Sequence, residues 1–330
     1  MKLINLLIFA ILVTRNVVHC LNLPSPKVTV TLESIFQEGL LVQPRENLYI
    51  LGTVHIGSKS AQEAELLIET VKPANVVVEI PPSRLKRLQK KASQMRIKEA
   101  ERKVSSYAGI NATPTGKAGS FKGADLLSAI GLFPALASEG YAKGGLSGML
   151  FCTIIVWGSL LKHSTTIGEE ADSLPRRNEF EAAVMASENV GAAVIPADFE
   201  FEDLIQTVAT SMTPLSWANF GFTLFCESIG LREPDPIRRG KQESMVDWEL
   251  RRRNVETARA SRAHGEISNP ELSEVLVNVR DRAFARICMD LLDNDKDKLG
   301  GPTVCVVGLV HLDGIVDSCG QQSPMTEKTQ

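Results

Sequence analysis

The chain has 330 residues, of which 44% are hydrophobic and 23% are charged. These values are typical of a globular protein with a sizeable core, in one large domain or two small ones. The formal net charge is −3, whereas a nucleic-acid-binding protein normally carries a clear basic excess, so no nucleic-acid partner is predicted.

The first 20 residues have the layout of a secretory leader. Lys2 precedes an apolar stretch at 6–13, and a turn-prone boundary follows at 20–24. The apolar run is short for a membrane span, so a cleaved leader is favoured, with an uncleaved anchor as the alternative. The leader predicts entry into the secretory pathway or an organelle such as a plastid. A polar segment at 21–45 is expected before a domain at 46–318.

A strand, a helix and a second strand are predicted at the start of this domain. Residues 48–51 form a short apolar run that Gly52 ends, and apolar residues at helical spacing then continue to Val71. Pro73 stops this helix, and the β-branched run 76–80 follows. Such a βαβ unit predicts two parallel strands that are neighbours in the sheet.

The middle of the domain contains three distinctive stretches. Residues 84–103 are basic and helix-prone, which is typical of a solvated helix face, and 105–123 has the composition of a flexible linker. Residues 146–161 are the most apolar internal stretch and are marginal for a membrane span. We expect a buried core helix there; the alternative is a membrane-associated hairpin with 129–137.

The remaining elements alternate between helices and short strands. Their expected positions are helix 179–188, strand 192–196, a helix from 204 to Pro214, helix 249–266, helix 271–292, strand 304–307 and a loose tail at 319–330. The pattern predicts an α/β fold with a mixed or largely parallel central sheet flanked by helices.

The six cysteines form no C-x-x-C pair. Zinc-ribbon and thioredoxin-like classes are therefore poor matches. Cys152 and Cys305 lie inside apolar runs and are expected in the core.

Polar residues follow the predicted strands. The first and last strands run into Gly52-Thr53-Val54-His55 and Gly308-Leu309-Val310-His311, and the other two end at Glu79 and Asp198. Ligands of parallel α/β sheets bind at this edge, and imidazole with carboxylate suits a first-row divalent metal. Each residue alone is more typical of an ordinary structural side chain, so spacing leaves a metal site and coincidence as alternatives.

Five sequence blocks resemble those of the TraB family, which includes Tiki-type proteins. They span residues 48–315 and comprise Leu51 to His55, Pro73 to Glu79, Glu179-Phe180, Arg280-Asp281 and Val306 to Ile315. The chain departs from the family pattern at Phe199, where an arginine often follows the aspartate, and at Leu309, where a small residue is usual.

The resemblance implies a Tiki-like fold and a metal-dependent peptidase site. His55 and His311 would be metal ligands or polarisers, and Glu79 would be a ligand or general base, with manganese, cobalt or zinc activating a water molecule. Arg280 would stabilise an oxyanion or hold a substrate carboxylate, but a structural salt bridge with Asp281 as its partner is the favoured role. The supporting residues would be Gly52, Glu179, Asp198 and Gly308.

A second function is equally compatible with the resemblance. Some TraB-domain proteins are associated with organelle membranes, and a fold does not determine a function. The alternative is therefore a non-catalytic, membrane-associated regulatory or tethering protein. The expected partners are a peptide or protein substrate in the first case and a membrane surface in the second.

Overall fold

The computed structural model describes residues 30–55, 59–90, 124–166, 178–240, 243–294 and 301–321. The predicted leader, the predicted linker and residues 322–330 of the predicted tail lie outside these ranges. The residues from Leu32 onward belong to one unit, which is an α/β structure built on a five-stranded mixed sheet. The predicted fold class is confirmed at this level.

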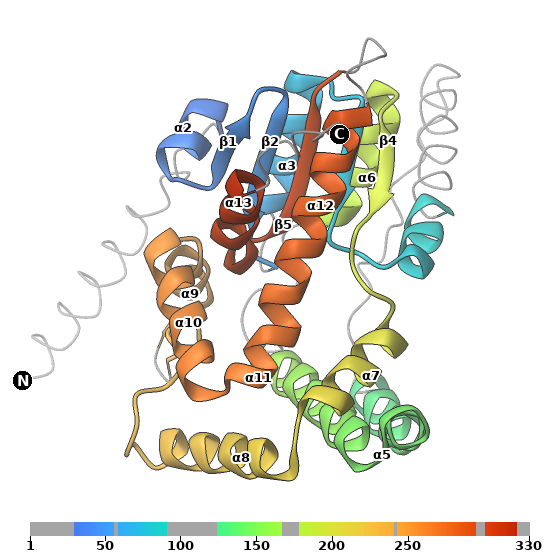
Figure 1. Ribbon diagram of the computed structural model, residues 1–330. Helices are drawn as coiled ribbons and strands as arrows, with labels where there is room; N and C mark the ends of the chain where they lie inside the picture. Colours follow the sequence, from blue (N-terminus) through green and yellow to red (C-terminus); the bar gives the residue numbers. More distant parts are fainter. Residues whose placement is uncertain are drawn as a thin grey trace, which may run out of the picture. The chain divides into compact units, whose positions relative to one another are not determined.

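The sheet is parallel except at one edge (Figure 1). Its order is β1-β2-β5-β3-β4, with β1 antiparallel to β2 and the other pairs parallel. The strands are β1 (Leu41–Arg45), β2 (Leu48–Thr53), β3 (Asn75–Val78), β4 (Ala193–Pro196) and β5 (Thr303–Gly308). Since β2, β3, β4 and β5 run in the same direction, their carboxyl ends share one edge of the sheet.

The last strand in the sequence lies in the middle of the sheet. β5 pairs with β2 on one side and β3 on the other, so the prediction that the first two parallel strands are neighbours was wrong. All six residues of β5 are buried, and a strand covered on both faces and paired on both sides is favoured in a central position. β4 was expected to be buried, but it is an edge strand whose Ala193 is exposed.

Helices cover both faces of the sheet. α3 (Lys59–Val71) and α6 (Glu179–Val190) pack together on one face, and α12 (Val279–Asn294) and α13 (Leu312–Gln321) pack together on the other (Figure 1). Ala64, Leu67 and Ile68 of α3 are fully buried, as their helical spacing predicts. This layer arrangement leaves the carboxyl edge of the parallel strands for polar side chains.

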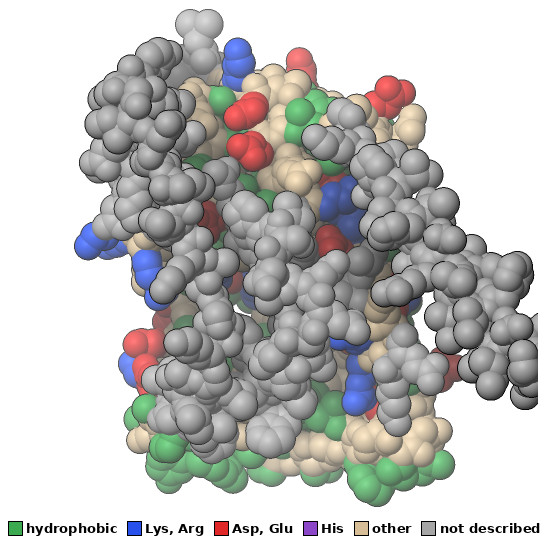
Figure 2. Space-filling view, turned by 180° about the vertical axis from the view of Figure 1, so that it is seen from behind, with side chains coloured by type: hydrophobic (Ala, Val, Ile, Leu, Met, Phe, Trp, Pro, Cys, Tyr) green, Lys and Arg blue, Asp and Glu red, His purple; other side chains and the backbone are tan. Residues whose placement is uncertain are grey.

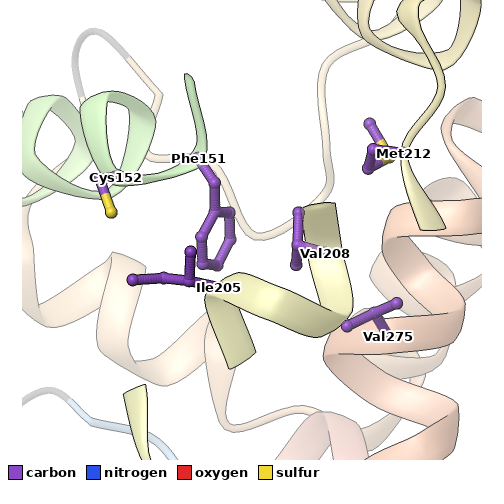
Figure 3. Close-up of a cluster of buried hydrophobic side chains, with 6 residues drawn as sticks. All are labelled: Phe151, Cys152, Ile205, Val208, Met212 and Val275. Carbon is purple, nitrogen blue, oxygen red and sulfur yellow. The ribbon is translucent and has the colours of Figure 1, made fainter. Parts of the chain in front are cut away.

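A second apolar cluster lies between α5 (Ala124–Thr166), α7 (Phe201–Ser211) and the π-helical turn η1 (Glu274–Asn278). It contains Phe151, Cys152, Ile205, Val208, Met212 and Val275 (Figure 3). α5 is kinked at Gly144 and Gly145. The stretch 146–161 is helical as predicted, but its burial is incomplete, because Leu146 is 63% exposed and Ile155 is 37% exposed.

The remaining elements refine several predicted boundaries. They are α2 (Leu32–Gln37), α8 (Pro214–Ser228), α9 (Met245–Arg252), α10 (Val255–Ser268), α11 (Pro270–Ser273) and the short turn η2 (Leu309–His311). α2 and β1 fall within the expected polar segment, and α13 extends past the expected start of the tail. The helix predicted at 249–266 is divided at Arg253 and Asn254, where the Asn254 side chain caps α10.

The described helices contain no candidate membrane span, because none combines sufficient length with sufficient apolar character to cross a bilayer.

Candidate functional site

Most of the predicted site residues lie in contact at the carboxyl edge of the sheet. β2 leads to His55, β3 to Glu79, β4 to Asp198 and β5 to His311, while α6 and α12 supply the partners. We call this group the strand-end cluster; it comprises His55, Glu79, Glu179, Asp198, Arg280, Asp281 and His311.

Gly308 lies at the point where the two Gly-x-x-His blocks meet. A Cβ atom added to Gly308 would be 3.2 Å from Oε2 of Glu79, 3.3 Å from Nε2 of His55 and 3.6 Å from Cδ2 of His311. The Gly308 main-chain N–H also donates to Oε2 of Glu79 at 2.6 Å. The structure therefore brings together the three residues that the sequence predicted as ligands, around a glycine whose added Cβ would crowd Glu79 and His55.

Gly52 has a different role, because it accommodates Leu309. A Cβ atom at Gly52 would be 2.6 Å from Cδ1 of Leu309 and 3.3 Å from Cδ2 of Leu312. Gly52 is paired with Val307 and Thr53 with Gly308, so Leu309, which follows Gly308, packs over Gly52. The absence of a side chain at Gly52 thus makes space for the side chain of Leu309.

Glu79 and Arg280 form the centre of the cluster. Arg280 donates from Nη2 to Oε1 of Glu79, and it holds Asp198 through Nε at 2.8 Å and through Nη2 at 3.0 Å. Its Nη1 donates to the main-chain oxygen of Leu276 at 3.0 Å, and the guanidinium stacks over Phe284. These contacts fix the guanidinium and agree with the salt-bridge role, which was the favoured one of its predicted roles.

The ionised form of Glu79 is strongly favoured. Burial alone would raise its pKa, but the hydrogen bond and charge of His311, together with the charges of Arg280 and His55, lower the pKa well below the usual range. Glu79 is only 8% exposed, so these contacts supply the stabilisation that water would otherwise give.

His311 is held by a chain of buried partners. Its Nδ1 contacts Oδ1 of Asp281 at 2.7 Å, and Oδ2 of Asp281 accepts from Nη1 of Arg262 at 2.6 Å. Burial would lower the pKa of His311, but the hydrogen bonds to Asp281 and Glu79 outweigh it and raise the pKa. The prediction that Asp281 pairs with Arg280 was wrong: adjacent helical residues point about 100° apart, so one faces Glu79 and the other faces His311.

His55 is held in a similar way on the opposite side. Its Nδ1 contacts the carboxylate of Glu179, which is 2% exposed at the first turn of α6, and its ring lies 5.4 Å from that of Phe180. The side chain of His55 is 39% exposed. Among the described residues no hydrogen-bond partner faces its Nε2, which points toward Gly308. His55 is therefore the member of the cluster with a ring nitrogen open to a ligand.

Sequence reasoning missed Arg262 and the full role of Gly314. A Cβ atom at Gly314 would be 1.9 Å from Oδ2 of Asp281 and 2.6 Å from Nη1 of Arg262, so α13 approaches this pair closely. Arg262 also forms an i,i+4 pair with Glu266, which is typical of a solvated helix and conceals its second contact. No local pattern in the sequence distinguishes Arg262 from its arginine neighbours.

The arrangement does not fit a divalent metal. In the parts of the chain that the structure describes, no group of three His, Cys, Asp or Glu side chains is arranged to hold an ion. The donor types are suitable, but one oxygen of Glu79 accepts from Gly308 and the other from Arg280, and Nη1 of Arg280 lies 3.3 Å from Nε2 of His311. The ligand roles of His55, Glu79 and His311 therefore stay predictions, and no chemical step is derived through a metal.

Cys288, Cys305 and Cys319 are buried free thiols. Cys305 is fully buried, and its contact with Cys288 together with burial raises the pKa of its thiol. Burial likewise raises the pKa of Cys319 to about 12. The expectation that Cys152 and Cys305 lie in the core is confirmed.

Comparison with known proteins provides no further assignment. The sequence matches no family model and no curated protein. The TraB resemblance therefore stays a prediction based on the five blocks.

Proposed function

We propose that the chain is a divergent TraB-type domain that hydrolyses peptide or related acyl bonds, with His55 activating the attacking water. The observation that carries this proposal is the pairing of His55 with buried Glu179, which leaves Nε2 of a partly exposed imidazole facing Glu79 and Gly308. The TraB assignment is supported by the convergence of blocks separated by more than 200 residues of sequence.

The pairing suits His55 to general base catalysis. A carboxylate that accepts from Nδ1–H fixes the ring orientation and the tautomer with an unprotonated Nε2. Nε2 then takes a proton from water as the water attacks the substrate carbonyl, and it returns the proton to the leaving amine. Water supplies the hydroxyl of the new acid, so the atoms balance without a co-reactant. Peptides are the substrate class that the resemblance implies.

The other cluster residues support this centre. The N–H groups of Arg280 are occupied by Asp198, Glu79 and the Leu276 carbonyl, which favours a fixed electrostatic role over direct binding of an oxyanion. Asp281 and Arg262 orient His311. The cluster thus resembles a preorganised polar environment with one open base.

His55→Asn is expected to lower kcat/KM by about 10²–10⁴-fold, because asparagine cannot accept the proton while general base catalysis contributes that factor. The measurement is cleavage of a fluorogenic peptide library, followed by kinetics on the best substrate. His264→Asn is the matched control, since His264 pairs with Glu227 outside the cluster. Failure of the wild-type protein to cleave any peptide or ester, or equal rates for His55→Asn, would reject the proposal.

An exposed apolar surface favours the second function, a non-catalytic membrane-associated protein. Hydrophobic side chains gather along the edge of the structure where α5 and α8 lie (Figure 2). Strongly exposed residues include Leu215 at 80%, Phe222 at 65% and Phe225 at 56% on α8, Leu231 at 76% just after α8, and Leu146 at 63% on α5. Exposed apolar side chains that gather in this way often mark a site of membrane or protein interaction.

Leu215→Glu combined with Phe222→Glu is expected to abolish binding to liposomes if this second function is correct, since each charge makes insertion of α8 into the interface unfavourable. The measurement is flotation of the protein with vesicles in a sucrose gradient. Leu250→Glu on α9 is the control, because Leu250 is 65% exposed but lies on another helix. Absence of wild-type flotation excludes the membrane function without affecting the hydrolase proposal.

A further inference from the structure

Arg280 occupies the part of the strand-end cluster where negative charge is concentrated. Its guanidinium contacts both oxygens of Asp198 and one oxygen of Glu79, and its Nη1 lies 3.3 Å from Nε2 of His311. Two carboxylates and an imidazole nitrogen are a typical ligand set for a first-row divalent cation. The guanidinium of Arg280 is therefore the cation that these carboxylates and this imidazole share, and they are donor types that also suit a metal ion.

The two histidines are also held as metal-binding histidines usually are. His55 and His311 each place Nδ1 against a buried carboxylate, Glu179 and Asp281 respectively. In metal centres this second contact orients the ring and directs Nε2 toward the ion. In this cluster the Nε2 of His311 lies 3.3 Å from Oε1 of Glu79, while the Nε2 of His55 faces Gly308.

The position of Arg280 is fixed by its surroundings. Its side chain is 13% exposed, stacks over Phe284 and donates from Nη1 to the main chain of Leu276 on the same helical segment. An arginine guanidinium is always charged and presents several donors in a rigid fork, so it binds two carboxylates without an ion. The guanidinium therefore has a fixed position within the strand-end cluster.

We infer that Arg280 is the permanent cation of the strand-end cluster and takes the place of a divalent metal between Glu79, Asp198 and His311. The inference deepens the proposed function, because it assigns the cation of the same site and makes the centre independent of a bound ion. It also assigns a latent property: without the guanidinium, Glu79, Asp198 and Nε2 of His311 lose the cation that they share, and we expect these donors to move together around a divalent ion in its place.

Arg280→Met tests this inference with cobalt chloride and zinc chloride as probes. We expect the wild-type protein to bind neither ion in isothermal titration calorimetry. We expect Arg280→Met to bind one ion per chain, with the visible absorption of cobalt bound to nitrogen and oxygen ligands and a higher Tm in its presence. Adding Asp281→Asn to Arg280→Met should weaken this binding by about 10- to 100-fold, because the support of His311 is lost.

Arg282→Met is the matched control, since Arg282 lies two residues further on the same helix, is 58% exposed and pairs with Glu274. This variant should bind no ion. Arg280→Gln serves as a second variant, because its amide can still donate to Glu79 or Asp198 if Arg280→Met does not fold.

Two results would overturn the inference. The first is a stoichiometric ion in wild-type protein that is lost in Glu79→Gln, as measured by elemental analysis. The second is a folded Arg280 variant that binds no cobalt or zinc. All of these measurements use the ion alone and no substrate, so a failure of the hydrolase proposal is distinguished from a failure of this one.

Discussion

Gly314→Ala is expected to lower the free energy of unfolding by about 2–4 kcal/mol, because it inserts a methyl group into a buried polar network. The added Cβ would lie 1.9 Å from Oδ2 of Asp281, which is 1% exposed and is held by His311 and Arg262. Either α13 moves away from α12 or the Asp281 carboxylate is displaced, and both changes break the chain that orients His311. Urea unfolding followed by circular dichroism measures the loss.

Gly320→Ala is the matched control on the same helix. Beyond its own helix, no atom of the described residues lies within 4 Å of its added Cβ, so this change should be neutral or stabilising by about a few tenths of a kcal/mol. A Gly314→Ala protein as stable as the control would show that α13 does not approach Asp281 closely in solution.

Glu63→Ala is expected to lower the free energy of unfolding by about 3–5 kcal/mol, the usual cost of removing one partner from a buried ion pair. Glu63 on α3 is 1% exposed, and Arg253 at the junction of α9 and α10 is 5% exposed. Arg253 holds both oxygens of Glu63 and also contacts Oε2 of Glu38 at 3.0 Å. The variant leaves a buried guanidinium with only the partly exposed Glu38 as its partner.

Lys59→Ala on the same helix provides the control, since its contact with Glu38 at 3.5 Å is on the surface. This change should cost less than about 1 kcal/mol. The double variant Glu63→Leu with Arg253→Leu should recover part of the loss, because apolar residues of similar size often replace a buried ion pair without a large penalty. A loss for Glu63→Ala no larger than that for Lys59→Ala would contradict the buried pair.

The elements of the sheet were largely predictable from local patterns, whereas their order was not. The apolar runs identified β2, β3 and β5, although the strand ends differ by one or two residues from those expected, and the helical spacing identified α3. The insertion of β5 between β2 and β3 depends on contacts over more than 200 residues, which no local pattern reports. β1 was missed because Pro44 is unusual in a strand, although it is tolerated at the antiparallel edge.

In the site, too, the features set by local sequence were predictable and those set by long-range contacts were not. Residues directly after strands were predictable, because parallel strands deliver their carboxyl ends to one edge, and His55, Glu79 and His311 do meet there. Their partners come from helices, and the rotation of a helix decides which neighbour each side chain meets. For this reason Arg280 was assigned the wrong carboxylate, and Arg262 was not recognised among the other arginines of its segment.

The central position of β5 also determines when the site can form during synthesis. During synthesis His55, Glu79 and Asp198 emerge well before residues 303–311, so β2 and β3 first lack the strand that lies between them in the finished sheet. The histidine, glutamate and arginine then lack the Gly308 N–H and the His311 ring that complete their contacts. The centre consequently assembles only after β5 has been inserted, and the unfinished sheet is the form most exposed to chaperones and to aggregation.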